Sequence, residues 1–129
     1  MAGEHGIAAD GIYSGSSDLQ LQRADVYFNE TRSGHYLSRS VLAELETGAL
    51  DQMRAGTCAH LYNPDNYIYH HGSAGNLWAK GYYTEGREII EHTLEAVRRE
   101  AEGCEHLEAV SLVHSLGGGT GSGFGSLLL

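Results

Sequence analysis

The sequence predicts an α/β fold with parallel strands, and three features of the second half of the chain indicate it. A helical pattern over about residues 85–101 is followed by a short apolar run at 109–113. That run leads into a glycine-rich loop at 117–123, after which another apolar element begins at Phe124. A strand, a helix, a second strand, a glycine loop and a further helix are typical of folds in which helices cover a parallel sheet. With 129 residues and no internal repeat, the chain is expected to be one domain or part of one.

Charge and composition narrow the possible functions. Eight Lys and Arg against seventeen Asp and Glu give a formal net charge of −9, which disfavours a partner that is nucleic acid or an anionic membrane. No apolar run approaches the roughly 20 residues of a membrane span, and the first residues lack the pattern of a signal peptide. Cys58 and Cys104 form no C-x-x-C pair, so a reducing, cytoplasmic environment is expected. A bound anion must therefore be held locally, by backbone N–H groups or through a metal.

The first half of the chain predicts short elements. Residues 1–20 show no periodicity and are expected to form a loop. Runs of β-forming residues at 24–30 and 36–45 predict two strands. A short helix is expected at 48–54, and Tyr67-Ile68-Tyr69 predicts a further short strand.

The helix at about 85–101 is the clearest element. Thr84 is its expected N-cap and Gly103 its expected end. The apolar run at 109–113 predicts a strand buried on both faces. Four apolar residues recur at the spacing of one helical face and are expected to face the core: Ile90, Leu94, Val97 and Ala101.

The loop Gly117-Gly118-Gly119-Thr120-Gly121-Ser122-Gly123 is a candidate anion site. Its glycines let backbone N–H groups converge, a helix start adds partial positive charge, and Thr120 and Ser122 add hydroxyl donors. A phosphate group fits such donors. The loop lacks the lysine of a Walker A motif and the glycine spacing of a Rossmann fingerprint. The alternative interpretation is a flexible glycine connection with no ligand.

Two other segments are candidates for the same site. Glu44 and Glu46 alternate onto one face at the end of an expected strand, where paired carboxylates could hold Mg²⁺. The alternative is two solvated acids, which is the usual state of such residues. The segment 72–76 combines small residues with an Asn amide and could reach a phosphate; the alternative is a loop with Trp78 packed into the core. The pattern alone does not separate these interpretations.

The histidines carry weaker signals. His70 and His71 are adjacent and have no ligand partners at zinc-like spacing, so they are expected to be solvated. His114 precedes Ser115, but no acid is placed to complete a triad, so His114 is expected to pack at a strand end. No residue is therefore predicted to be catalytic.

Several motifs of the chain resemble the tubulin family. The loop at 117–123 resembles the signature heptapeptide of tubulins, which is closely related to that of the bacterial division GTPases. Residues 75–86, Gly-Asn-Leu-Trp-Ala-Lys-Gly-Tyr-Tyr-Thr-Glu-Gly, resemble the corresponding segment of the β type, as do residues 17–23 and 114–116. The similarity runs from about Glu4 to the last residue. It implies a partial, Rossmann-like nucleotide-binding domain with parallel strands.

The resemblance also implies GTP and Mg²⁺ as ligands and gives individual positions a role. Glu46 corresponds to the acid that reaches the nucleotide's Mg²⁺, and residues 74–76 correspond to the loop that senses the terminal phosphate. Glu44, Thr47 and Leu77 depart from the usual Asp, Pro and Asn of the family, which is expected to change affinity more than fold. The positions that correspond to nucleotide contacts are Glu46, Ala74, Gly75, Asn76, Ser115, Gly118, Gly119, Thr120 and Gly121.

The function implied for residues 1–129 is that of a partial GTP-binding domain of a microtubule subunit. Such a subunit pairs with an α-tubulin-like subunit, polymerises into the cytoplasmic microtubule lattice and couples GTP hydrolysis to disassembly. The partner subunit completes hydrolysis in the family, so no complete catalytic site is expected here. The first strand of the domain and everything after the glycine-rich loop have no counterpart, so a fragment with a gap in its sheet is expected. The alternatives are a nucleotide-binding module that never polymerises and a truncated or pseudogene-derived product with no autonomous GTP binding.

Overall fold

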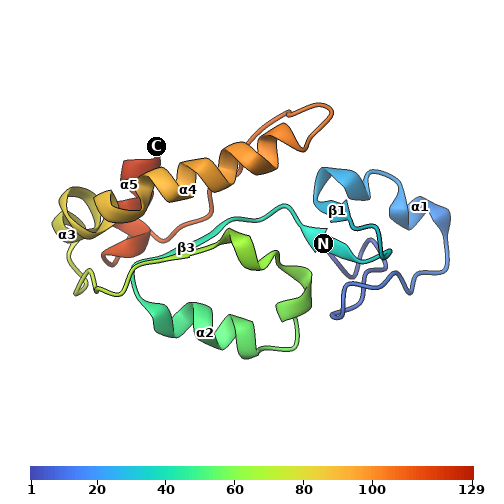
Figure 1. Cartoon of the computed structure of the whole chain (residues 1–129), viewed down its shortest axis with the longest axis horizontal. Coiled ribbons are helices and arrows are strands. Elements are labelled where there is room, and N and C mark those ends of the chain that lie inside the picture. Colours follow the sequence, from blue (N-terminus) through green and yellow to red (C-terminus); the bar gives the residue numbers. More distant parts are fainter. The chain divides into compact units, whose positions relative to one another are not determined.

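The computed structural model describes residues 1–129 and divides into two compact units, which are described separately (Figure 1). Unit one comprises residues 1–40 and 51–66, and unit two comprises residues 41–50 and 67–129. The helix α2 (Thr47–Ala55) begins in unit two and ends in unit one, which confirms the short helix expected at 48–54.

Unit one consists of short elements around a small core. In chain order they are α1 (Asp18–Leu21), the 3₁₀ helix η1 (Ala24–Val26), β1 (Phe28–Glu30), β2 (Tyr36–Ser38) and the 3₁₀ helices η2 (Ala59–Leu61) and η3 (Pro64–Asn66). The strands β1 and β2 pair antiparallel, with Phe28 opposite Ser38. Ile7, Phe28 and Leu61 form the buried core of this unit.

Unit two contains the parallel pairing that the sequence predicts. Its elements are β3 (Leu42–Glu44), β4 (Tyr67–Tyr69), α3 (Trp78–Tyr83), α4 (Glu85–Glu102), the π-helical turn η4 (Thr120–Phe124) and α5 (Gly125–Leu128). β3 and β4 pair in parallel. Figure 1 shows α3 and α5 beside the first half of α4. The core that these elements share consists of Leu45, Ala74, Ile89 and Phe124.

The two strands expected in the first half are shorter than their sequence patterns. The run at 24–30 forms a strand only in β1, because η1 occupies its start. The run at 36–45 is divided into β2 and β3, which pair with different strands. Between them the Ser40 carbonyl accepts a hydrogen bond from the Asn66 side-chain amide at 3.2 Å. That carbonyl is therefore satisfied by a side chain, without a neighbouring strand.

The helix α4 confirms the element expected at 85–101, but its buried face lies one residue away from the expected face. Ile89, Thr93 and Ala96 are buried, whereas Leu94 is 50% exposed. The Thr93 hydroxyl donates to the Ile89 carbonyl at 2.9 Å, which satisfies the buried polar group within the helix. A hydroxyl can therefore occupy the core position that the apolar pattern assigns to a neighbouring residue.

Thr84 stands at the N-cap position of α4 but does not cap it through its side chain. The Thr84 hydroxyl donates to the Lys80 carbonyl at 3.1 Å, at the end of α3. Gly103 follows the helix as expected, with right-handed backbone and its N–H group bonded to Arg99 and Ala101 carbonyls. The side chain expected to begin α4 therefore ends α3.

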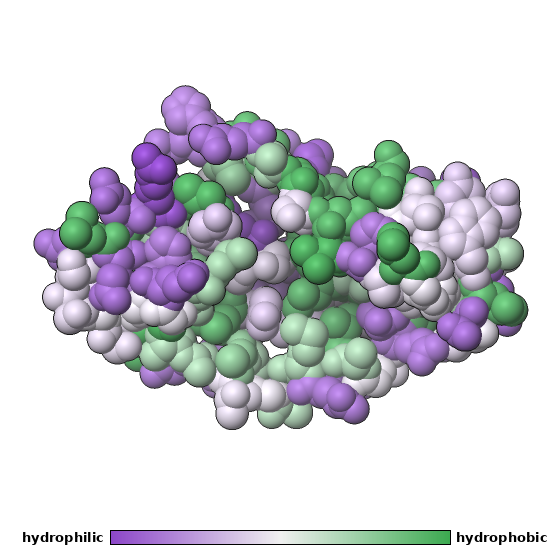
Figure 2. Space-filling view, turned by 180° about the vertical axis from the view of Figure 1, so that it is seen from behind, coloured by the Kyte–Doolittle hydropathy of each residue, from purple (hydrophilic) through white to green (hydrophobic).

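The strand expected at 109–113 does not form. Val110 and Leu112 are exposed, and Val113 is 91% exposed. A strand needs a neighbour for its N–H and C=O groups, and the β3–β4 pair takes up no third strand. Hydrophobic side chains are correspondingly visible on the surface in Figure 2. Among the helices, none combines the length and hydropathy that a membrane span requires.

Candidate functional site

Unit two brings together three segments that carry predicted site residues. These segments comprise residues 44–46, 72–76 and 117–123. The Thr120 hydroxyl donates a hydrogen bond to Glu44 Oε1 at 2.5 Å, which joins the glycine-rich loop to the end of β3. A Cβ atom placed on Gly119 would clash with the Ala74 side chain, so the glycine-rich loop lies directly against the 72–76 loop. Residues far apart in the sequence therefore form one site.

The backbone of the glycine-rich loop presents unused donors. Gly118 has a φ of +81°, a conformation that favours glycine, and Gly119 has a φ of −90°. The N–H groups of Gly117, Gly118 and Gly119 donate to no acceptor in the chain. The carbonyl groups of Gly117 and Gly118 accept hydrogen bonds from the Ser115 and Ser122 hydroxyls. The peptide oxygens are thus occupied, and the N–H groups have no partner in the chain; Gly117 and Gly118 are exposed, whereas Gly119 is buried.

Part of the glycine content has a packing cause. A Cβ atom on Gly81 would clash with the Gly119 carbonyl, and one on Gly123 would clash with the Trp78 carbonyl. A Cβ atom on Gly86 would clash with the Gly81 carbonyl. Gly81 and Gly123 let α3 approach the loop backbone to backbone, and Gly86 lets α4 approach α3. The loop is therefore packed against α3 at Gly119 and Gly123, whereas Gly117 and Gly118 are exposed.

Each of the two acids at the end of β3 contacts one of the loops. Glu44 Oε1 accepts from the Leu45 N–H group at 2.8 Å in addition to the Thr120 hydroxyl. Glu46 is exposed, and its Oε1 accepts a hydrogen bond from the Ser73 hydroxyl. That hydroxyl in turn accepts from the Gly75 N–H group at 3.1 Å. Glu44 therefore orders the glycine-rich loop, and Glu46 orders the 72–76 loop.

The donor set at these acids fits a shared cation. No group of three or more His, Cys, Asp or Glu side chains that could hold a metal occurs in the chain. Mg²⁺ characteristically takes only one or two protein carboxylates and completes its shell with water and phosphate oxygens. Glu46, an exposed carboxylate with one hydroxyl contact, meets that requirement, whereas Glu44 Oε1 already accepts two hydrogen bonds. The two acids do not form a cage built from protein ligands alone.

The 72–76 loop contains two residues with left-handed backbone. Gly75 has a φ of +55° and Asn76 a φ of +59°. A Cβ atom on Gly118 would lie 3.8 Å from Asn76 Oδ1, so the Asn76 amide is near the glycine-rich loop. Asparagine is among the few non-glycine residues that adopt this conformation readily. The tight turn therefore places an amide side chain near Gly118 of the glycine-rich loop.

Ser115 and His114 support the loop from the side of the preceding chain. The Ser115 hydroxyl donates to the Gly117 carbonyl at 2.7 Å, and a Cβ atom on Gly121 would clash with it. His114 Nδ1 lies 2.8 Å from the Gly121 carbonyl oxygen. His114 thus has a packing role, as expected, although it packs beside a loop and not at a strand end.

One contact of His70 in this unit is not indicated by the sequence. His70 Nδ1 lies 2.9 Å from Glu85 Oε2 at the start of α4, and it accepts a hydrogen bond from the Gly72 N–H group at 3.1 Å. The expectation of a solvated histidine is therefore wrong for His70. His71 is exposed. Because α4 brings Glu85 back to the end of β4, only the fold reveals this pair.

Trp78 does not pack into the core. Its side chain is 43% exposed and stacks on Tyr82 with ring centroids 4.7 Å apart. Its Nε1 group donates to the Ser126 hydroxyl at 3.4 Å. Trp78 is the first residue of α3 and contacts α5 from the surface, so the core contact of the 72–76 loop is made by Ala74 and not by Trp78.

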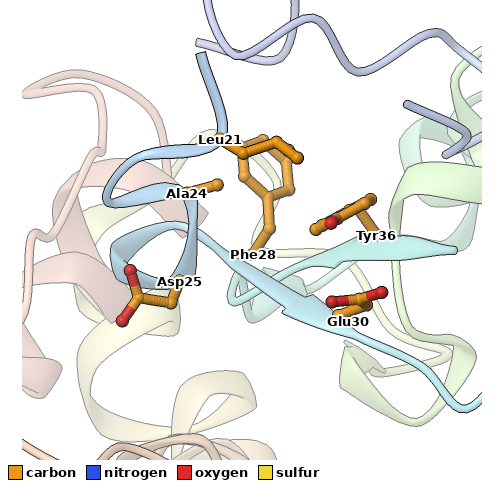
Figure 3. A pocket seen from close by; sticks show the side chains of 6 residues that line it. All are labelled: Leu21, Ala24, Asp25, Phe28, Glu30 and Tyr36. Carbon is orange, nitrogen blue, oxygen red and sulfur yellow. The ribbon is translucent and has the colours of Figure 1, made fainter. Parts of the chain in front are cut away.

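A cavity in unit one is unsuited to an anion. Its volume is about 370 Å³, and it is lined by Leu21, Ala24, Asp25, Phe28, Glu30 and Tyr36. Figure 3 shows the Glu30 carboxylate close to the Tyr36 ring, its cross-strand partner. Burial and this carboxylate raise the pKa of Tyr36 above its ordinary value. With two acids and no Lys or Arg in its lining, the cavity would repel phosphate.

This chain is similar to known proteins over its whole length. A model of the Tubulin/FtsZ family, GTPase domain, matches residues 1–129. The "Tubulin beta-2 chain" of Hypocrea virens is 54% identical over 129 residues, and that of Emericella nidulans is 55% identical over 129 residues. Each alignment covers 100% of this chain and 29% of the relative. The chain therefore spans less than a third of the length of these relatives.

Proposed function

Since this chain belongs to the Tubulin/FtsZ family, we propose that its glycine-rich loop binds the phosphates of a guanine nucleotide. The observation that carries the proposal is the set of unused N–H groups at Gly117, Gly118 and Gly119 beside the Thr120 hydroxyl. Converging backbone N–H groups form a concavity that binds anions. No Lys or Arg lies in the loop, so these donors must supply the attraction that a basic side chain provides elsewhere.

The neighbouring residues are proposed to complete the phosphate site. The Asn76 amide and the backbone of Ala74 and Gly75 approach the terminal phosphate from the 72–76 loop. Ser115 and Gly121 hold the glycine-rich loop in shape through the contacts of the Ser115 hydroxyl. None of these groups is proposed to be catalytic.

Glu46 is proposed to reach a nucleotide-bound Mg²⁺. The ion would neutralise the phosphate charge, and its shell requires a carboxylate at the edge of the site. Glu46 is exposed, and its carboxylate is bound only by the Ser73 hydroxyl, so the side chain can turn toward an incoming ion. Glu44 is tied at two points and is less free to turn.

The activity of the longer protein is a wider proposal. The relatives are named tubulin β chains, and we propose that a protein containing this chain is a GTP-binding microtubule subunit that pairs with an α-tubulin-like partner in the cytoplasm. Polymerisation and hydrolysis belong to that whole protein. The second candidate is a product without autonomous GTP binding. The exposed apolar segment at 109–113 favours it, because the chain that leads into the loop has no pairing partner.

Equilibrium titration with GTP and with guanosine tests the phosphate site. We expect the chain to bind GTP in the presence of Mg²⁺ and to bind guanosine at least tenfold more weakly, because only GTP meets the loop donors. Thr120→Ala should weaken GTP binding by about tenfold, since a hydrogen bond to a charged group contributes roughly 1.5–3 kcal/mol. Thr57→Ala removes an exposed hydroxyl from unit one and is the matched control. Equal affinities for GTP and guanosine would overturn the proposal.

Co-sedimentation with microtubules separates the wider proposal from the second candidate. A chain that acts as a microtubule subunit should pellet with microtubules assembled from α- and β-tubulin. A chain that binds GTP and stays in the supernatant would be a nucleotide-binding module without polymerisation. A chain that does neither would support the second candidate.

A further inference from the structure

Glu44 occupies the hydroxyl donor of the glycine-rich loop. Its Oε1 atom accepts from the Thr120 hydroxyl at 2.5 Å and from the Leu45 N–H group at 2.8 Å. A threonine hydroxyl has a single proton to donate. While Thr120 donates to Glu44, it cannot donate to a phosphate oxygen. The carboxylate thus takes the position at Thr120 that a ligand phosphate needs.

The contact also restricts the charge of a ligand that can bind beside Thr120. A phosphate within hydrogen-bond reach of Thr120 would lie close to the Glu44 carboxylate, and like charges repel strongly in a partly buried site. Neither the loop nor the 72–76 segment contains a Lys or Arg to offset this repulsion. Lys80 Nζ lies 4.0 Å from the position of a Cβ atom on Gly75, beside the 72–76 loop, and forms no ion pair with Glu44. A phosphate that carries its own divalent cation brings positive charge to the Glu44 and Thr120 side of the site.

We propose that Glu44 is a specificity-determining residue that competes with phosphate for the Thr120 hydroxyl and so excludes phosphate ligands that lack a divalent cation. This inference rests on the proposed function of the glycine-rich loop and deepens it. Glu46 has no such effect, because it contacts the Ser73 hydroxyl of the other loop. The two acids at the end of β3 therefore have different roles: Glu44 screens the charge of the ligand, and Glu46 serves the ion.

Two substitutions separate the effect of the Glu44 charge from the effect of its side-chain length. Glu44→Gln keeps the length of the side chain and removes the charge, whereas Glu44→Asp keeps the charge and withdraws it by one methylene group. Glu91→Gln, on the exposed surface of α4, removes one negative charge elsewhere in unit two and is the control. Far-UV circular dichroism verifies that each variant retains the helices of the parent chain.

The affinity for GTP is measured by equilibrium titration in excess EDTA and again with Mg²⁺. In EDTA we expect Glu44→Gln to raise the affinity about tenfold or more, Glu44→Asp to raise it less, and Glu91→Gln to leave it unchanged. With Mg²⁺ the gain of Glu44→Gln should fall to threefold or less, because the ion already offsets the carboxylate. Glu44→Gln/Thr120→Val should lose most of the gain in EDTA, since Thr120 then has no hydroxyl to donate to a phosphate in place of the weaker, neutral Gln acceptor.

The outcomes distinguish this inference from the proposed function. If the parent chain binds GTP with Mg²⁺ and Glu44→Gln gains nothing in EDTA, the role of Glu44 is overturned and the phosphate site stands. An equal gain from Glu91→Gln would also overturn it, because the effect would then be one of net charge. If neither the parent nor Glu44→Gln binds GTP under either condition, both proposals are overturned.

A measurement without ligand tests the contact itself. The melting temperatures of Glu44→Ala, Thr120→Val and the double variant form a double-mutant cycle, in which Ala is used because a Gln side-chain oxygen could still accept from Thr120. If the Glu44 carboxylate holds Thr120, the two losses should not add, and the double variant should melt within about 1 °C of the less stable single variant, whereas sites without contact add nearly fully. Strictly additive losses would contradict the competition on which the inference depends.

Discussion

Gly118 and Gly119 are neighbours in the loop but require glycine for different reasons. Gly118 has a φ of +81°, and a Cβ atom there would meet only Asn76 Oδ1 at 3.8 Å. Gly119 has an ordinary φ of −90°, but a Cβ atom there would clash with Ala74. The cost of a side chain is therefore conformational at Gly118 and steric at Gly119.

A compensating substitution distinguishes these two causes. Gly119→Ala should lower the free energy of unfolding by about 1–3 kcal/mol through overpacking, and Ala74→Gly in the same chain should restore much of that loss. Gly118→Ala should cost about 1–2 kcal/mol because of its left-handed backbone, and Ala74→Gly should not restore it. The measurement is thermal or urea unfolding followed by circular dichroism. Equal behaviour of the two glycines toward Ala74→Gly would contradict the packing of the two loops.

Glu46 and Glu44 should differ in their effect on the metal dependence of binding. Glu46→Ala is expected to weaken GTP binding in Mg²⁺ by about tenfold, because a lost carboxylate contact to a shared ion is comparable to a charged hydrogen bond. In EDTA the same variant should bind GTP like the parent chain. Glu44→Ala should weaken Mg²⁺-dependent binding less than Glu46→Ala does. Equal losses of GTP affinity for the two variants in Mg²⁺ would mean that Glu46 is a solvated acid that does not contact the ion.

The rotation of α4 about its axis is determined by contacts at its first turn. Gly86 must face the Gly81 carbonyl, since a Cβ atom there would clash with it. Ile89, Thr93 and Ala96 follow on the same face of the helix and are buried with it. The apolar pattern gives greater weight to Leu94, which is half exposed, than to Thr93, whose hydroxyl is satisfied inside the helix. A close approach of two backbones therefore overrides the periodicity of side-chain hydropathy.

Truncating side chains on the two faces of α4 tests this assignment. Ile89→Ala should lower the free energy of unfolding by about 2–5 kcal/mol, the usual cost of an aliphatic deletion in a core. Leu94→Ala should cost clearly less, because half of that side chain is already in water. Chemical denaturation of both variants provides the comparison. A larger loss for Leu94→Ala would favour the face that the sequence pattern predicts.

The elements could be predicted from local sequence where their cause is local. The helix pattern of α4, the short helix at 48–54 and the glycine-rich loop are visible in the sequence. The strand expected at 109–113 does not form, and local sequence could not show this, because a strand exists only where another chain segment pairs with it. The contact of His70 with Glu85 and the contact of Glu44 with Thr120 join residues that are distant in the sequence. They depend on the fold, and no residue spacing in the sequence predicts them.

Net charge and exposed apolar surface have opposite effects on the solubility of the whole molecule. The formal net charge of −9 favours solubility. Val110, Val113 and Leu116 expose apolar surface near the glycine-rich loop in sequence, and their segment has unpaired backbone. Extended apolar segments without a partner promote association between chains. We therefore expect the isolated chain to associate through this segment.

A charged substitution in this segment should improve solubility without loss of stability. Val113 is 91% exposed, so Val113→Asp removes no core contact and adds a negative charge. The fraction of monomer, measured by size-exclusion chromatography with light scattering, is expected to rise, while the melting temperature stays within about 2 °C. A marked fall in melting temperature would mean that Val113 is buried in solution, and the exposed position of this segment would then be wrong.

Nuclear magnetic resonance of the ¹⁵N-labelled chain during a titration with Mg²⁺ and GTP identifies the N–H groups that bind phosphate. We expect the amide resonances of Gly117, Gly118 and Gly119 to shift on addition of GTP and not on addition of guanosine, because phosphate oxygens accept from these N–H groups. The amide of Gly34, whose N–H group is bonded to the Thr31 carbonyl in unit one, should not shift with either ligand. GTP-dependent shifts that spare the three loop glycines would contradict the assignment of this loop as the phosphate site.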